Sequence, residues 1–299
     1  MIIPPYLNPG DKISIVSPAK IIQEKEIAYA IQEFEKRGLI VELGKHVFSQ
    51  WNRFAGTDQQ RLEDVQQVLD NPDIKAIFFS RGGYGSVRII DKLDFTTFVR
   101  RPKWLVGYSD ITIFHQHVSS NYNIVSCHGS MPLNMIDSKL NRQSTSRLLD
   151  TLFGKDKTIK LKAHKLNRQG IARGKLIGGN FSVLCSLIGT NSFTNLDHKI
   201  LFIEDLFEEM YYLDRLFYQL KKSGSLDRLA GLIVGGFTDI TDVSAWFGVD
   251  INELINEHFK GYNFPMAFDF PIGHVALNLP LLNGMEYELI VSNNETILK

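Results

Sequence analysis

The chain has 299 residues, 44% of them hydrophobic and 22% charged, so it can bury one large core or, in better keeping with its length, two of ordinary size. Its 33 basic and 33 acidic residues give a net charge of zero, which argues against nucleic acid or a membrane as partner and favours a small molecule or peptide. The N-terminus lacks the basic and apolar regions of a signal peptide, and no later stretch has the apolar length of a membrane span, so we expect a cytoplasmic location.

The first half of the chain alternates short apolar strands with amphipathic helical segments. Thr57 and Gln60 have the spacing of a capping box, which marks the start of one of these helices. This alternation predicts a Rossmann-like domain with a mainly parallel sheet, in which ligands bind at the carboxyl ends of the strands. The pattern places strands at 12–17, 39–43, 74–79, 104–107 and 124–127, and helices at 23–37, 57–69, 86–93 and from 111 onward.

The periodicity weakens between residues 137 and 169, where the polar and basic segment 155–168 has the composition of a linker. We therefore expect an N-terminal domain at 1–150, a linker at 151–170 and a C-terminal α/β domain at 171–299. In the C-terminal domain the pattern predicts strands at 172–177, 200–203, 229–234 and 265–270, helices at 181–188, 209–222 and 251–259, and a hairpin at 286–298.

Ser109 lies between the predicted strand 104–107 and the helix that begins at Ile111. Enzymes place nucleophiles on sharp strand-to-helix turns, and the backbone N–H of Asp110 could stabilise the oxyanion that attack by a serine creates. Serine and aspartate are also preferred helix N-caps, so the turn has a purely structural interpretation. These residues alone favour the cap.

A glycine-rich turn, residues 80–85, follows the predicted strand 74–79. Its flexible backbone could direct N–H groups at an anion, as a phosphate cradle or an oxyanion hole, or it could be a tight turn without a ligand. A dinucleotide site is disfavoured because Gly82, Gly83 and Gly85 do not complete G-x-G-x-x-G. The segment 174–179 likewise lacks the spacing of a P-loop.

Glu204, Asp205 and His274 lie where catalytic groups gather in α/β proteins, at or just after predicted strands. Taken singly, a pair of helix-start carboxylates and an ordinary loop histidine are the simpler interpretations. Together with Ser109, however, His274 and Glu204 supply the nucleophile, the base and the orienting acid that serine hydrolysis requires.

The other histidines and the two cysteines are weaker candidates. His115 and His117 are two residues apart on a predicted helix and point in different directions, so one metal ion cannot bind both. His128 could line a pocket, although an ordinary loop role is simpler. Cys127 and Cys185 lie in apolar contexts without CxxC spacing, which indicates buried thiols, and we expect no metal or other cofactor.

In order along nearly the whole chain, these motifs resemble those of the serine LD-carboxypeptidases, a family that includes muramoyl-tetrapeptide carboxypeptidases and microcin-C self-immunity peptidases. The resemblance implies Ser109 as nucleophile, His274 as general acid/base and Glu204 as its orienting carboxylate. It also implies that the backbone N–H groups of Gly83 and Asp110 form the oxyanion hole, that the active site lies between the two domains, and that the protein is a homodimer. The motifs that carry it are Pro9-Gly10-Asp11-Lys12, Phe54-Ala55-Gly56-Thr57-Asp58 with Arg61, Arg81-Gly82-Gly83-Tyr84-Gly85, Gly107-Tyr108-Ser109-Asp110, Gly178-Gly179-Asn180, Glu204-Asp205 and Gly273-His274.

Within the family, the segment from Glu204 to Arg215 resembles the muropeptide branch, whose members cleave between an L-diamino acid and a C-terminal D-alanine during peptidoglycan recycling. A substrate of this kind has a free carboxylate, and Arg81 beside the glycine turn is a candidate to bind it, with a structural role as the alternative. Ser130 stands where relatives commonly have proline, which affects the shape of the pocket and not the triad.

Other functions stay open at this point. A microcin-type peptidase would cleave an aminoacyl-nucleotide amide, and a non-catalytic ligand-binding protein would use the glycine turn for an anion and leave Ser109 unreactive. A general esterase would hydrolyse simple esters regardless of peptide stereochemistry. The α/β-hydrolase type of esterase is disfavoured because Ile111 replaces the second glycine of G-x-S-x-G.

Overall fold

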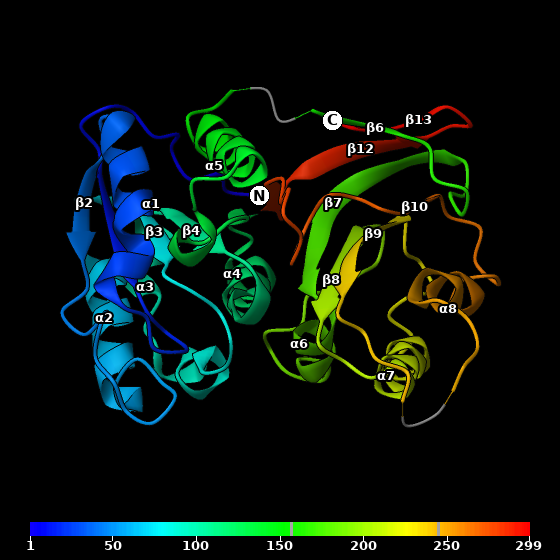
Figure 1. Cartoon of the computed structure of the whole chain (residues 1–299), viewed down its shortest axis with the longest axis horizontal. Coiled ribbons are helices and arrows are strands. Elements are labelled where there is room, and N and C mark those ends of the chain that lie inside the picture. Colours follow the sequence, from blue (N-terminus) through cyan, green and yellow to red (C-terminus); the bar gives the residue numbers. More distant parts are fainter. Residues whose placement is uncertain (156–157, 244–245) are drawn as a thin grey trace.

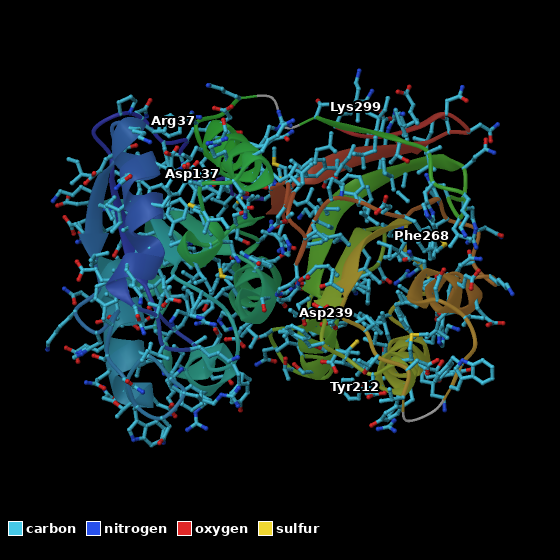
Figure 2. The ribbon with its side chains drawn as sticks, viewed as in Figure 1. Arg37, Asp137, Tyr212, Asp239, Phe268 and Lys299 are labelled. Atoms are coloured by element: carbon cyan, nitrogen blue, oxygen red, sulfur yellow. The ribbon has the colours of Figure 1, made fainter. Side chains whose placement is uncertain are left out.

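The computed structural model describes residues 1–155, 158–243 and 246–299, which form an α/β protein of two halves, each built on its own sheet (Figure 1). The six-stranded sheet has the order β11-β5-β4-β3-β1-β2, and the seven-stranded sheet has the order β10-β9-β8-β7-β12-β13-β6. Side chains fill the space between each sheet and its helices (Figure 2). One hydrophobic cluster includes Val106 and Cys127 of the first sheet as well as Leu176 and Phe202 of the second, so the two cores are continuous.

The N-terminal sheet is parallel except for one strand, as the alternating pattern predicts. The parallel strands are β1 (Lys12–Val16), β2 (Ile40–Leu43), β3 (Ile74–Phe79), β4 (Trp104–Gly107) and β5 (Ser126–His128). The exception is β11 (Leu281–Asn283), which comes from the C-terminal half and pairs antiparallel with β5. The helices of this half are α1 (Glu24–Lys36), α2 (Asp58–Asp70), α3 (Thr96–Arg100), α4 (Thr112–Tyr122) and α5 (Lys139–Leu152). The predicted capping box at Thr57 and Gln60 is present at the start of α2.

The C-terminal sheet is mixed. Its parallel part contains β7 (Gly170–Asn180), β8 (Ile200–Leu206), β9 (Gly231–Thr238) and β10 (Met266–Ala267). Antiparallel pairing then adds β12 (Glu286–Val291), β13 (Glu295–Leu298) and β6 (Ile159–Lys162), and the first two form the predicted hairpin. The helices are α6 (Phe181–Ser186), α7 (Met210–Lys222) and α8 (Ile251–His258). None of the helices in the described part of the chain could cross a membrane, because none combines the necessary length and apolar character.

Two expectations about secondary structure are wrong. The segment 86–93 is not a continuous helix but two short 3-10 turns, Ser86–Arg88 and Ile90–Lys92, because Ile89 between them departs from helical geometry. The segment 137–169 is not irregular: it contains α5 and β6. The periodicity is weak in α5 because Ser144, Thr145 and Thr151 occupy part of its buried face beside three leucines. Residues 156 and 157 of the expected linker lie outside the described residues, and the division into domains stays a prediction.

The two halves meet where the end of β7 contacts the start of α4. Gly178 has no room for a side chain, because a Cβ would overlap the carbonyl oxygen of Phe202, and a Cβ on Gly179 would overlap Thr112 Oγ1. The close approach lets the Asn180 backbone N–H donate to Thr112 Oγ1 at 2.9 Å. In the same interface, the Gln116 side chain donates to the Gly178 carbonyl at 2.9 Å, and Asn283 Oδ1 accepts from the Gly178 N–H at 3.0 Å. Hydrogen bonds between buried groups therefore fix the relative position of the halves.

Replacing Thr112 by valine removes the acceptor of the Asn180 N–H, and we expect the free energy of unfolding to fall by about 1–3 kcal/mol, the cost of an unsatisfied buried donor. Urea unfolding measures this change. Thr145→Val is the matched control: its buried hydroxyl has no hydrogen-bond partner among the described residues. Equal stabilities of the two variants would contradict the importance of the interface bond.

Candidate active site

Ser109 occupies a strained turn directly after β4. Its φ angle is 64°, a left-handed conformation that residues other than glycine rarely adopt and that is often found at functional sites. The cap hypothesis is wrong, because α4 has Ile111 as its N-cap and receives no side-chain capping bond. The Asp110 carboxylate instead accepts from the Ser86 backbone N–H at 2.9 Å. The turn is thus tied to the segment that follows the glycine turn.

The glycine turn lies against Ser109. A Cβ on Gly82 would lie 3.0 Å from Ser109 Cβ and 3.1 Å from Oγ, a tight contact that would push Ser109 away by a few tenths of an ångström. Gly83 and Gly85 have φ angles of 118° and 153°. The buried guanidinium of Arg61 supports the turn from behind, since it donates to the carbonyl of Gly85 at 3.1 Å and also to that of Pro18. The loop that could form an oxyanion hole therefore adjoins the serine, while the roles of Gly83 and Asp110 as donors stay predictions.

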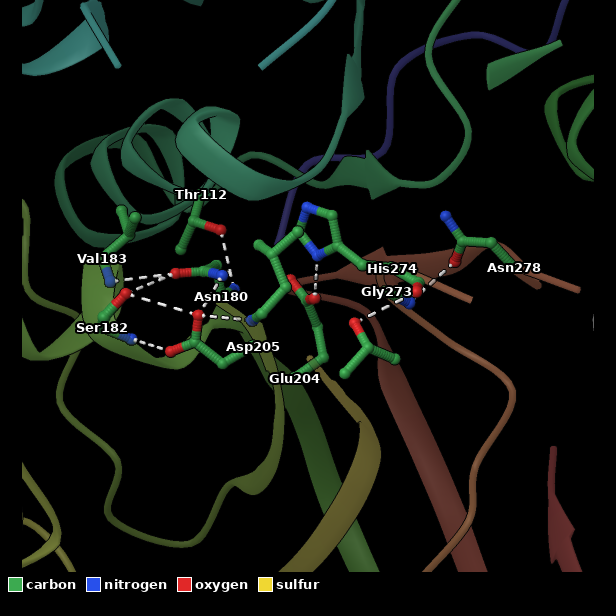
Figure 3. A network of polar contacts seen from close by, with 11 residues as sticks. Thr112, Asn180, Ser182, Val183, Glu204, Asp205, Gly273, His274 and Asn278 are labelled. Carbon is green, nitrogen blue, oxygen red and sulfur yellow. Dashed lines mark hydrogen bonds and ion pairs between the residues drawn. The ribbon is translucent and has the colours of Figure 1, made fainter. Parts of the chain in front are cut away.

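His274 and Glu204 are hydrogen-bonded to each other on the other side of the interface (Figure 3). His274 Nδ1 lies 2.7 Å from Glu204 Oε2, and Glu204 is fully buried. Gly273 has a φ of 92° and no room for a Cβ, which would overlap the Glu204 carboxylate, so glycine permits the pairing. Asn278 Oδ1 accepts from the Gly273 N–H at 3.0 Å and holds the loop. Because Nδ1 of His274 is hydrogen-bonded to Glu204, Nε2 is the ring nitrogen that remains available for proton transfer.

The two halves enclose a cavity of about 410 Å³, within the usual range for small-molecule sites. Ser109, Gly83 and Arg81 line it from the N-terminal half, and His274 lines it from the C-terminal half, so the structure brings these predicted residues together. Glu204 lies behind His274. Among the described residues no hydrogen bond joins Ser109 to His274, and catalytic hydrogen bonds are often long in the absence of a substrate.

The cavity walls carry opposite charges. Lys20 and Arg81 lie on the N-terminal wall, and Asp205 and Glu208 lie on the C-terminal wall. Burial, reinforced by the neighbouring Glu204, raises the pKa of Asp205 to about 7. Its carboxylate also accepts from Asn180 Nδ2 and the Ser182 N–H, each at 2.8 Å (Figure 3). Burial raises the pKa of Glu208 as well.

The sequence-based search for site residues missed several residues of the cavity, among them Tyr108, Glu208 and Lys20. The ring centroid of Tyr108 lies 4.7 Å from that of His274, so Tyr108 restricts the position of the imidazole. Glu208 belongs to a motif used for the resemblance, and its position four residues after Glu204 is the one signal that could have identified it. Lys20 has no such signal, because only the fold places the first strand-to-helix turn beside the glycine turn.

The remaining candidate residues are buried or make hydrogen bonds within the protein. Arg81 donates from Nη1 to the Ile21 carbonyl at 3.0 Å, so at least part of its guanidinium is structural, and its role with substrate stays a prediction. His128 is not in a loop but in β5, fully buried, with its ring 5.8 Å from Tyr108. Cys127 and Cys185 are buried and free, as expected. The described residues contain no group of three His, Cys, Asp or Glu side chains placed to hold a metal ion.

His115 is a buried support for the nucleophile turn. Its Nε2 donates to the Gly107 carbonyl at 2.8 Å, and its Nδ1 lies 2.8 Å from Ser126 Oγ and so accepts from that hydroxyl. These two hydrogen bonds hold His115 between β4 and β5 as the neutral tautomer that has its proton on Nε2. Burial lowers the pKa of His115 to about 4.

Because the folded state resists protonation of His115 while the unfolded state does not, stability from this residue is full above pH 6.5 and falls as the pH drops toward 4. We expect the unfolding free energy of the wild type, relative to that of His115→Gln, to decrease by up to about 3 kcal/mol over this window. Denaturant titrations at several pH values measure the difference. If the unfolding free energies of the wild type and of His115→Gln changed in parallel with pH, the lowered pKa assigned to His115 would be contradicted.

The two halves also match known proteins. Residues 13–129 match the LD-carboxypeptidase N-terminal domain, and residues 173–289 match the LD-carboxypeptidase C-terminal domain. The chain belongs to the LD-carboxypeptidase family. Among its curated relatives in this serine peptidase family is a probable murein peptide carboxypeptidase of Bacillus subtilis (strain 168), 30% identical over 99% of this chain and 94% of the relative.

Solved structures agree with this membership. The muramoyltetrapeptide carboxypeptidase from Oxalobacter formigenes superposes with a TM-score of 0.85 at 26% identity, covering 96% of this chain and 97% of that protein. MccF in complex with glutamyl sulfamoyl guanosine superposes with a TM-score of 0.88 at 20% identity, covering 98% and 97%, and this likeness concerns the fold alone. The curated relatives also include the microcin C7 self-immunity protein MccF of Escherichia coli, 25% identical over 91% of this chain and 89% of the relative.

Proposed function

We propose that this LD-carboxypeptidase family member is a serine peptidase that hydrolyses the bond between an L-diamino acid and a C-terminal D-alanine in muropeptides, as in peptidoglycan recycling. The observation that carries the proposal is the hydrogen bond between His274 and buried Glu204, since His274 lines a cavity shared with the strained Ser109. The names of the relatives support the choice of murein peptides as substrates.

The reaction follows from the roles of the three side chains. Ser109 Oγ attacks the carbonyl carbon of the diamino acid while His274 Nε2 takes its proton, and backbone N–H groups of Gly83 and Asp110 stabilise the oxyanion. The C–N bond then breaks, and His274 returns the proton to the departing D-alanine nitrogen. Water hydrolyses the acyl-enzyme by the same sequence in reverse. Glu204 stabilises the imidazolium and keeps a proton on Nδ1.

The polarity of the cavity fits such a peptide. A C-terminal D-alanine bears a carboxylate, and an L-diamino acid bears a side-chain amine, so the substrate is negative at one end and positive at the other. Cationic side chains line one wall and the carboxyls of Asp205 and Glu208 line the other. This arrangement distinguishes the proposed substrate from the simple ester of a general esterase, which has neither charge.

Replacing Ser109 by alanine removes the nucleophile, and we expect release of D-alanine from a tetrapeptide ending in L-lysine–D-alanine to fall by at least about 10³-fold. The rate of free D-alanine formation measures this. Ser120→Ala, on the exposed side of α4, is the matched control and keeps full activity.

The substrate scope separates the alternatives. The wild type should not cleave the all-L tetrapeptide, whereas an esterase acting on activated esters would ignore stereochemistry. Failure of the folded wild type to release D-alanine, combined with cleavage of an aminoacyl sulfamoyl nucleotide, would move the assignment to the microcin-type peptidases. Failure with both substrates would favour a ligand-binding protein.

Glu204→Gln keeps the size of the side chain but offers an N–H in place of a carboxylate oxygen. The amide can donate to His274 Nδ1 and so favours the tautomer whose Nε2 cannot accept the serine proton, and we expect kcat to fall on the order of 10⁴-fold. Steady-state kinetics measure the loss, and circular dichroism confirms the fold. A kcat within tenfold of wild type would remove Glu204 from the triad.

A further inference from the structure

Lys20 is a cation in the cavity whose ammonium group has no hydrogen-bond or ion-pair partner in the described part of the chain. It lies in the first turn after β1 and lines the same cavity as Ser109 and His274. Among the described residues, Lys20 Nζ makes neither a hydrogen bond nor an ion pair. A half-buried ammonium group without a partner is free to bind an anion that enters the cavity.

The packing of its stem places this ammonium beside the glycine turn. A Cβ on Gly83 would lie 2.5 Å from Lys20 Cδ, 2.7 Å from Cγ and 2.8 Å from Cε. The aliphatic part of the side chain thus occupies the space above Gly83 that any other residue type would fill. Glycine at this position has two effects: it provides the left-handed backbone and it makes room for Lys20.

The surroundings of Lys20 are electropositive. Burial lowers the pKa of Lys20, and the nearby guanidinium groups of Arg53 and Arg81 add to this effect, while the buried Asp110 opposes it. Arg81 is less available than Lys20, because its Nη1 is already bonded to the Ile21 carbonyl. Lys20 is therefore the better candidate for direct contact with an anion.

We propose that Lys20 binds the C-terminal carboxylate of the substrate and thereby makes the enzyme a carboxypeptidase. This inference rests on the proposed function. The terminal carboxylate is one residue beyond the scissile carbonyl, a span of no more than about 3.6 Å. A carbonyl in the predicted oxyanion hole at Gly83 would thus place the carboxylate next to the side chain packed on Gly83. An internal peptide bond has no carboxylate there and leaves Lys20 unpaired.

The test compares a tetrapeptide ending in L-lysine–D-alanine with the same peptide ending in D-alaninamide. We expect the kcat/KM of the wild type to favour the acid by about 10- to 100-fold, the range for a charge-assisted hydrogen bond. Lys20→Met keeps an unbranched stem on Gly83 but has no charge. Its kcat/KM for the acid should fall while its kcat/KM for the amide stays the same, so the preference for the acid should be lost. Lys20→Arg should retain most of it.

Lys25→Met is the matched control, because it removes the same charge from an exposed position on α1. A Lys20→Met variant that still prefers the acid as the wild type does would overturn the inference while leaving the peptidase function intact. Loss of the preference in Arg81→Met and not in Lys20→Met would assign the carboxylate to Arg81 instead. Absence of D-alanine release by the wild type would overturn the proposed function, and the role of Lys20 with it.

Discussion

The contact between the end of β7 and the first turn of α4 fixes Ser109 relative to His274. Gly179 allows the backbone of one half to touch Thr112 of the other, while Gly178 allows close packing against Phe202 within the C-terminal sheet, and buried hydrogen bonds then fix the two halves relative to each other. Catalytic side chains must be held within fractions of an ångström, which a flexible hinge between domains could not achieve. The strand β11, which the C-terminal half contributes to the N-terminal sheet, adds a second connection.

Glycine has a different function at each point around the cavity. Gly82 brings the backbone against Ser109, Gly83 makes room for the aliphatic stem of Lys20, and Gly273 lets His274 reach the buried carboxylate of Glu204. In all three cases a Cβ would press on a side chain of the site, namely Ser109, Lys20 or Glu204. The small size of the residues in the glycine-rich turn thus serves close packing around Ser109 and Lys20.

Basic and acidic side chains lie on opposite walls of the cavity. His274 lines the cavity with Glu204 behind it, the cations Lys20 and Arg81 lie on one wall, and the carboxyls of Asp205 and Glu208 lie on the other. Burial raises the pKa values of both carboxyls. A peptide with a negative end and a positive side chain is the ligand that such walls complement.

The sequence by itself determined the local features: the alternation that produces a parallel sheet, the capping box at Thr57, the terminal hairpin and the blocks of motifs around Ser109, Glu204 and His274. These depend on neighbours along the chain, and their patterns are visible there. It could not show that α5 packs through serines and threonines, that β11 crosses to the other sheet, or that Lys20 lies on Gly83, because each depends on residues far apart in the sequence. Tertiary structure also removed the cap interpretation of Ser109, because Ile111 is the N-cap of α4 and no side chain caps that helix. A cap and a nucleophile share the same residue type and differ only in what surrounds them, and the cavity that Ser109 shares with His274 supports its proposed role as nucleophile.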